Sequence, residues 1–216
     1  MHVPLKFKKM DMDILSDFIR EYPLATLVVQ TSITKTGQGL DAMHLPLRIQ
    51  GFGNQCTLSG HIARANPLWE TVNNDDQALI IFNGPNAYVS PNYYPSKSET
   101  GRVVPTWNYS VVHVRGRIKF HHDEGWLLEL IEQLTNDNEA GQLSPWRVDD
   151  APEKYTKNLL KAIVGVEIEV DSMEGNFKLS QNKAELDRKG VIDGLSKSKV
   201  KSENSVAEQM RKLYDD

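Results

Sequence analysis

Cysteine is nearly absent from this 216-residue chain, which contains only Cys56. A single cysteine cannot form an intramolecular disulfide, and no cluster of Cys and His residues has the spacing of a zinc site. The sequence also lacks a run of 18 apolar residues and an apolar N-terminal segment of the signal-peptide kind. We therefore expect a cytoplasmic protein with no membrane association, no structural disulfide and no bound metal.

An excess of positive charge is missing as well. The sequence has 25 Lys and Arg residues against 29 Asp and Glu, which gives a formal net charge of −4 at pH 7. This balance excludes a protein that coats nucleic acid through its overall charge, although a local basic patch is compatible with it. The Gly-rich dinucleotide fingerprint and the phosphate P-loop are absent too. No Ser or Cys is arranged with the histidines as in a catalytic triad, so we assign no catalytic residue.

The sequence does contain closely spaced strands, with its long helices late in the chain. Alternating and apolar runs predict strands at 24–31, 41–50, 55–61, 77–83, 87–91, 110–120, 162–170 and 177–182. Helices are expected at 11–22, after Asn66, after Asp123, at 152–161 with Asp150 as cap, at 183–195 and from Ser205. This pattern predicts a mainly β (α+β) fold, an antiparallel barrel or curled sheet with peripheral helices.

Several local signals refine this fold. A polar loop with Gly37 joins the first two strands, and Pro46 inside the second implies a sheet edge or a bulge. A turn at 174–175 separates the last two strands. The long segment 92–105, which carries two tyrosines, is expected to be an ordered cover.

The predicted domain organisation has two parts. Residues 1–182 form the barrel, with helical insertions at about 122–161, and residues 183–216 form a helical C-terminal extension. A capping box, Ser205 to Glu208, is expected to open the last helix of that extension.

The strand at 110–120 has one apolar face and one basic face. The basic face carries His113, Arg115, Arg117 and Lys119. A solvated sheet surface accounts for such a face, and the alternative is a wall that faces a phosphate or another subunit. The sequence leaves both interpretations open.

The segment 60–69, GHIARANPLW, ends a predicted strand and begins a predicted helix. Asn66 can cap the first amides, and Pro67 suits the first helical turn. A helix N-terminus beside His61 and Arg64 combines unpaired N–H groups, a helix dipole and a guanidinium, which together suit a phosphate. An arginine in a salt bridge beside an ordinary strand-to-helix turn is the alternative, and these ten residues alone favour it, because most helix starts bind nothing.

Several segments, taken in order, resemble the PaiB-like family of FMN-binding negative transcriptional regulators. They are His44-Leu45-Pro46, residues 60–67, residues 84–91, residues 104–109 and residues 179–182. The resemblance spans about residues 1–210. It implies a flavin-binding split β-barrel, similar in plan to pyridoxamine-phosphate oxidases, that works as a homodimer with FMN in the cleft between subunits.

The resemblance also implies which residues contact FMN. They are His44, Leu45, Pro46, His61, Ala63, Arg64, Ala65, Asn66, Trp107, Asn108 and Ser180. Residues 44–46 would line the flavin and residues 61–66 would hold its phosphate, which agrees with the anion site argued above. The remaining three would approach the ring and close the pocket. Further basic contacts to the phosphate would come from Arg115, Arg117 or Lys97, or would be absent.

Three functions compete at this point. The first is an FMN-binding regulator with a DNA or regulatory partner, although the helix after Asp123 carries Glu124, Glu129 and Glu132 where a recognition helix would be basic. The second is an FMN-dependent oxidoreductase of the pyridoxamine-phosphate-oxidase-like class that acts on a small molecule, with the cofactor supplying the chemistry. The third is a haem-binding module with His44 or His61 as axial ligand. We take the first as our hypothesis.

Overall fold

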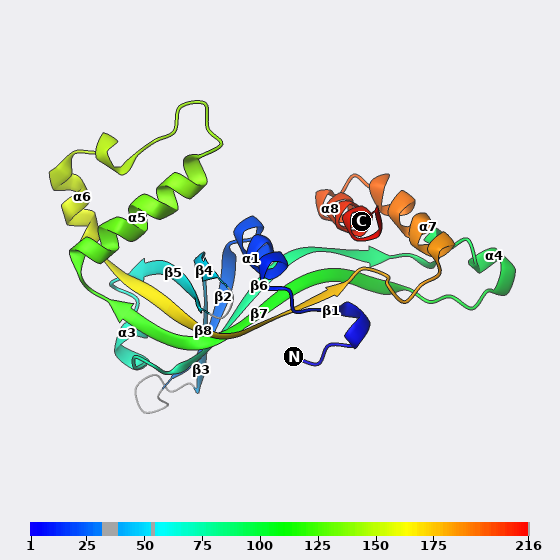
Figure 1. Cartoon of the computed structure of the whole chain (residues 1–216), viewed down its shortest axis with the longest axis horizontal. Coiled ribbons are helices and arrows are strands. Elements are labelled where there is room, and N and C mark those ends of the chain that lie inside the picture. Colours follow the sequence, from blue (N-terminus) through cyan, green and yellow to red (C-terminus); the bar gives the residue numbers. More distant parts are fainter. Residues whose placement is uncertain (32–38, 53–54, 216) are drawn as a thin grey trace. The chain divides into compact units, whose positions relative to one another are not determined.

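The structure, a computed structural model, describes residues 1–31, 39–52 and 55–215 (Figure 1). The predicted loop residue Gly37 lies outside the described residues. The chain divides into two compact units. Unit 1 comprises Met1–Phe18, Asn83–His113 and Glu174–Asp216, and unit 2 comprises Ile19–Phe82 and Val114–Met173.

The described residues form a mostly antiparallel eight-stranded sheet with the order β3-β2-β6-β7-β8-β5-β4, and β1 pairs with β8. The strands are β1 Lys8–Lys9, β2 Leu24–Gln30, β3 Leu40–Pro46, β4 Arg48–Phe52, β5 Gln55–Ala63, β6 Gln77–Val89, β7 Thr106–His121 and β8 Ile163–Lys178. The α-helices are α1 Met12–Glu21, α3 Leu68–Thr71, α4 Lys97–Thr100, α5 Glu124–Glu139, α6 Glu153–Leu160, α7 Glu185–Ser196 and α8 Lys201–Asp215. Short 3-10 helices are η1 Leu5–Phe7, η2 Pro91–Tyr93 and η3 Val148–Asp150.

The sheet of unit 2 curls because its two edge strands follow one another in the chain. β3 pairs with β2 and β4 pairs with β5, and only Leu47 lies between β3 and β4. A Cβ atom on Gly60 of β5 would lie 2.7 Å from the Pro46 carbonyl oxygen, so the two edges meet at this point. Pro46 therefore occupies the edge position predicted for it.

The single strand predicted at 41–50 is wrong, since the structure has two strands there. The chain leaves β3 at Leu47, whose N–H donates to the Pro23 carbonyl at 2.9 Å, and then enters β4. The Leu47 side chain is 1% exposed. A buried residue at the corner thus fixes the change of direction.

The two long strands β6 and β8 are continuous where the sequence predicts interruptions. β6 runs through Gly84 and β8 runs through Gly175 without a turn. A Cβ atom on Gly84 would lie 2.7 Å from the Phe18 ring, and one on Gly175 would lie 2.8 Å from Leu15. Both glycines make room for side chains of α1, which explains why they do not mark turns.

The helices of unit 2 begin close to where their caps predict. Asp123 accepts a hydrogen bond from the Trp126 N–H at 2.8 Å and opens α5 as predicted. The prediction that Asp150 caps α6 is wrong, because its carboxylate accepts from the Arg147 N–H at 2.8 Å within η3. Pro152 precedes the first helical residue instead.

Unit 1 has its own apolar core. It gathers side chains from β6, the following loop, the residue after β8 and the two C-terminal helices: Ala87, Val89, Tyr94, Leu179, Val191, Leu195, Val206, Ala207 and Met210. The loop after β6 is ordered by η2, α4 and the buried Tyr94, as predicted. The boundary expected at residue 182 stays a prediction, and α7 and α8, which lie side by side in Figure 1, share this core with Ala87 and Val89.

The last helix starts earlier than its sequence suggests. α8 begins at Lys201, and the Ser205 hydroxyl donates to the Lys201 carbonyl at 3.1 Å inside the helix. The predicted capping box at Ser205 is therefore wrong.

No helix within the described ranges is long and apolar enough to cross a membrane.

Candidate functional site

The segment from β5 to α3 places His61 and Arg64 at the end of a strand. β5 ends at Ala63, and α3 is a single turn of four residues. Pro67 is the N-cap residue of α3, and the side chain of Asn66, one residue earlier, accepts from the Leu68 N–H at 2.9 Å. Because so short a helix has only a small dipole, the side chains must supply most of the attraction for an anion.

Arg64 is held firmly by main-chain groups. Its Nε–H donates to the Lys161 carbonyl at 2.7 Å and its Nη2 to the Ile163 carbonyl at 2.8 Å, while Nη1 lies 3.2 Å from Nδ1 of His122. Among the described residues it forms no ion pair, so the salt-bridge interpretation of this arginine does not apply. Three of its five N–H groups are occupied, and two are left for a ligand.

His61 lies beside Gly165 of β8 and is half-buried. Its Nδ1 is buried and has no hydrogen-bond partner within the described part of the chain. Burial lowers the pKa of His61, so the imidazole is neutral at pH 7. A buried polar atom without a partner costs about 1–3 kcal/mol, which makes this nitrogen a candidate ligand contact.

Residues 44–46 lie on the edge strand β3, and their side chains differ in how far they are exposed. His44 is exposed, and its Nδ1 lies 3.0 Å from the Thr26 hydroxyl. Leu45 is 3% exposed and belongs to the core, whereas Pro46 is exposed. Since Pro46 meets Gly60 of β5, the structure brings this strand end close to the segment that carries His61.

The other predicted contacts, Trp107, Asn108 and Ser180, belong to unit 1. Trp107 is 50% exposed, and its indole N–H donates to the Asn86 side chain at 3.0 Å. Asn108 and Ser180 are buried and bonded to each other, with the Asn108 amide donating to the Ser180 hydroxyl at 2.9 Å. Trp107 thus has surface to offer a ligand, and the contact of all three residues with flavin stays a prediction.

Lys178 is a residue of interest that the sequence reasoning missed. It ends β8, is half-buried, and donates from Nζ to the Thr106 hydroxyl at 2.6 Å and the Trp107 carbonyl at 2.5 Å. Burial, together with the nearby Lys183, lowers the pKa of the Lys178 ammonium group. Its place in the segment FKLSQN, a predicted strand end rich in hydrogen-bonding groups, is the signal in the sequence that could have pointed to Lys178.

The basic face of β7 is compensated by its neighbour β8. Arg117 lies 3.1 Å from Glu169 and 3.6 Å from Asp171, and Lys119 is also paired with Glu169. These contacts favour the interpretation of a solvated sheet surface over that of a phosphate wall.

Within the described residues no group of three His, Cys, Asp or Glu side chains could hold a metal.

Proteins of similar sequence match most or all of this chain. A family model described as "Putative FMN-binding domain" matches residues 1–172. The Bacillus subtilis protein named Protease synthase and sporulation protein PAI 2 is 33% identical, and the match covers 100% of this chain and 97% of that protein. An uncharacterized protein of Emericella nidulans is 34% identical over 85% of each chain.

Solved structures share the fold at much lower identity. The FAD and heme binding protein from Mycobacterium smegmatis matches with a TM-score of 0.56 and 14% identity, over 80% of this chain and 73% of that one. The flavocytochrome Anf3 from Azotobacter vinelandii matches with a TM-score of 0.53 and 13% identity, over 82% and 72%. The predicted split β-barrel with peripheral helices is thereby confirmed.

Proposed function

This chain belongs to the PaiB-like family of FMN-binding domains, and from this membership we propose that it binds FMN with Arg64 at the cofactor phosphate. The observation that carries the proposal is the set of contacts that Arg64 makes. Its charge has no carboxylate partner among the described residues, and main-chain carbonyls fix its orientation. A guanidinium held in this way is preorganised for an anion, because little side-chain freedom is lost on binding.

The neighbouring residues fit the same role. The buried Nδ1 of His61 is available to a polar group of the cofactor, and His44 and Pro46 offer exposed surface at the adjoining strand edge. Ala63 and Ala65 are exposed and small, so they allow a ligand to approach the main chain. FMN, when bound, supplies a ring that accepts and donates electrons. Trp107, Asn108 and Ser180 complete the set in our proposal.

We further propose that the protein is a cytoplasmic homodimer with a regulatory role of the PaiB type. The B. subtilis relative that matches over the full length is named for protease synthesis and sporulation, which are processes rather than a reaction. The acidic side chains of α5, including Glu124 and Glu129, disfavour this helix as a DNA-reading element. Regulation would then act through a protein partner or through the state of the flavin.

The decisive experiment compares FMN with riboflavin, which lacks the phosphate, in fluorescence titrations of the native protein and Arg64→Ala. We expect the native protein to prefer FMN, and the variant to lose about ten- to hundredfold in FMN affinity, equivalent to about 1.5–3 kcal/mol. Riboflavin affinity should change little. The exposed Arg102 provides a control, since Arg102→Ala should leave both affinities unchanged.

This comparison separates binding from structure. Arg64 also holds the Lys161 and Ile163 carbonyls, so its loss can disturb the fold of unit 2. A purely structural role would weaken FMN and riboflavin equally, and that result contradicts the proposal. Arg64→Lys keeps the charge and should retain part of the preference for FMN.

Two further assays of the purified protein distinguish the competing functions. Consumption of reduced nicotinamide in the presence of FMN would favour the oxidoreductase. A Soret band on adding haem, lost in His44→Ala or His61→Ala, would favour the haem-binding module. Absence of both signals, together with tight FMN binding, is the result we expect.

A further inference from the structure

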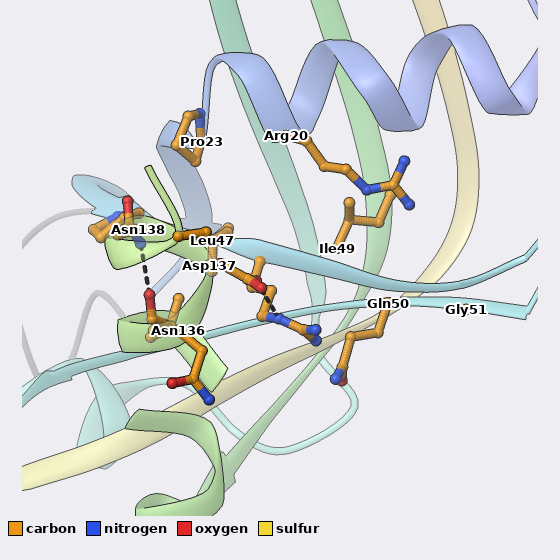
Figure 2. A pocket seen from close by; sticks show the side chains of 13 residues that line it. Arg20, Pro23, Leu47, Ile49, Gln50, Gly51, Asn136, Asp137 and Asn138 are labelled. Atoms are coloured by element: carbon orange, nitrogen blue, oxygen red, sulfur yellow. Dashed lines mark hydrogen bonds and ion pairs between the residues drawn. The ribbon is translucent and has the colours of Figure 1, made fainter. Parts of the chain in front are cut away.

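Unit 2 contains a cavity of about 720 Å³, which we call the Arg48 cavity (Figure 2). The end of α1, the corner between β3 and β4, and the C-terminal part of α5 surround it. Its volume lies within the range of small-molecule sites. Of the residues predicted to contact FMN only Pro46 lines it, so the cavity is not accounted for by the proposed phosphate site.

Two guanidinium groups and one carboxylate set the charge of this cavity. Arg48 donates from Nε to Asp137 at 2.6 Å, while its Nη1 is enclosed and has no acceptor among the described residues. Figure 2 shows Arg20 reaching from α1 toward Ile49 on β4. Arg48 therefore keeps a donor that Asp137 does not occupy, which suits a ligand that carries a negative charge.

The rest of the wall combines hydrocarbon and amide groups. The apolar lining residues are Pro23, Pro46, Leu47, Ile49, Leu134 and Ala140. Gln50, Asn136 and Asn138 add amides, of which Gln50 donates to Gln133 at 2.8 Å and Asn138 to the Leu134 carbonyl at 2.7 Å. Such a lining suits a ligand with an apolar body and a small polar end.

We propose that the Arg48 cavity binds a small organic monocarboxylate with an apolar body. A carboxylate has the planar shape that a guanidinium recognises, and the contact with Asp137 occupies only one edge of Arg48. A dianion such as a phosphate monoester would be repelled by Asp137, which is 55% exposed on the same wall. The ligand class therefore differs from that of the FMN phosphate.

The test uses 2-naphthoate and its neutral analogue 2-naphthamide as probes, titrated calorimetrically into the full-length protein with and without FMN. We expect one naphthoate per chain and an affinity at least about tenfold higher than for the amide, since a charge-assisted contact is lost in the amide. Arg48→Gln should abolish this preference, while Arg102→Gln, which alters an exposed arginine of unit 1, should keep it.

A second variant keeps the proposal testable where Arg48→Gln fails to fold. Asp137→Asn removes the competing carboxylate and makes the charge of the wall more positive by one unit, so it should tighten naphthoate binding and let inorganic phosphate compete. Equal affinity for acid and amide, or no binding of either, would overturn the proposal. Displacement of naphthoate by FMN would overturn the separation of the two sites, whereas failure of FMN to bind leaves the naphthoate result unaffected.

Discussion

His61 and Arg64 stand three residues apart, yet their surroundings act on them differently. Burial penalises the charged form of the imidazole and lowers the pKa of His61. The Arg64 guanidinium, by contrast, donates hydrogen bonds to three groups that fix its orientation. The pair thus offers a phosphate one fixed positive charge and one neutral nitrogen.

The depressed pKa of His61 makes stability depend on pH in a defined direction. In the unfolded chain His61 has a pKa of about 6.5. Below that pH the unfolded state binds the proton more readily than the folded state, so the free energy of unfolding falls as the pH decreases from about 6.5 toward the folded pKa. Urea unfolding across this range should show the decline, and His61→Gln should reduce it.

Bound FMN should raise the pKa of His61, because a phosphate dianion stabilises the imidazolium. A His61 signal in an NMR titration with a pKa above 6.5 in the absence of FMN would contradict this account.

At the scale of elements, α8 is a part of the unit 1 core rather than an appended tail. Met210 is fully buried, and its sulfur lies 3.5 Å from the Asn108 amide nitrogen. Met210→Ala should lower the free energy of unfolding by about 2–5 kcal/mol, through lost burial and the cavity left behind. Denaturant unfolding followed by circular dichroism measures this change.

An exposed residue of the same helix provides the comparison. Lys212→Ala should change stability by less than about 0.5 kcal/mol. Similar, small effects of both substitutions would show that α8 unfolds independently of the rest of unit 1.

The elements also show where local sequence is informative. Asp11 accepts hydrogen bonds from the Asp13 and Ile14 N–H groups, and Asp123 caps α5, so both helix starts follow from residues next to them. The sequence predicts a break between two strands at Gly84 and a turn at Gly175, because a glycine required by close packing looks the same in sequence as a glycine required by a turn. What decides between the two is the side chain opposite, which comes from a distant part of the chain.

In the candidate site, too, some residues can be predicted from local sequence and others cannot. Arg64 and His61 stand out because their chemistry is local to one strand end, although the carbonyls that hold Arg64 lie near residue 162. The Arg48 cavity has no local signal at all. Arg48 and Asp137 are 89 positions apart and meet only after α5 has packed against β4.

At the scale of the whole molecule, charge is compensated rather than concentrated. The net charge is −4, and the basic residues Arg117 and Lys119 of β7 are paired with acidic residues of β8. Neither feature provides the basic stripe by which a protein holds the nucleic acid backbone. These pairings disfavour this face of the sheet as a surface for DNA.

At the scale of the whole molecule, the proposed cofactor site also predicts that the protein forms a dimer. If FMN lies in a cleft between two subunits, it binds the dimer more tightly than the monomer, and by linkage it must then strengthen dimerisation. We expect light scattering to give a mass about twice the 24.4 kDa of one chain. Adding FMN should lower the concentration at which dimers dissociate.

Arg64→Ala connects this prediction to the cofactor site. The variant should still form dimers at high concentration, but FMN should strengthen its dimerisation far less, because the phosphate contact is lost. Riboflavin should have the same small effect on the native protein and the variant. A monomer of 24.4 kDa that binds FMN stoichiometrically would contradict the dimer, and it would place the whole cofactor site within one chain.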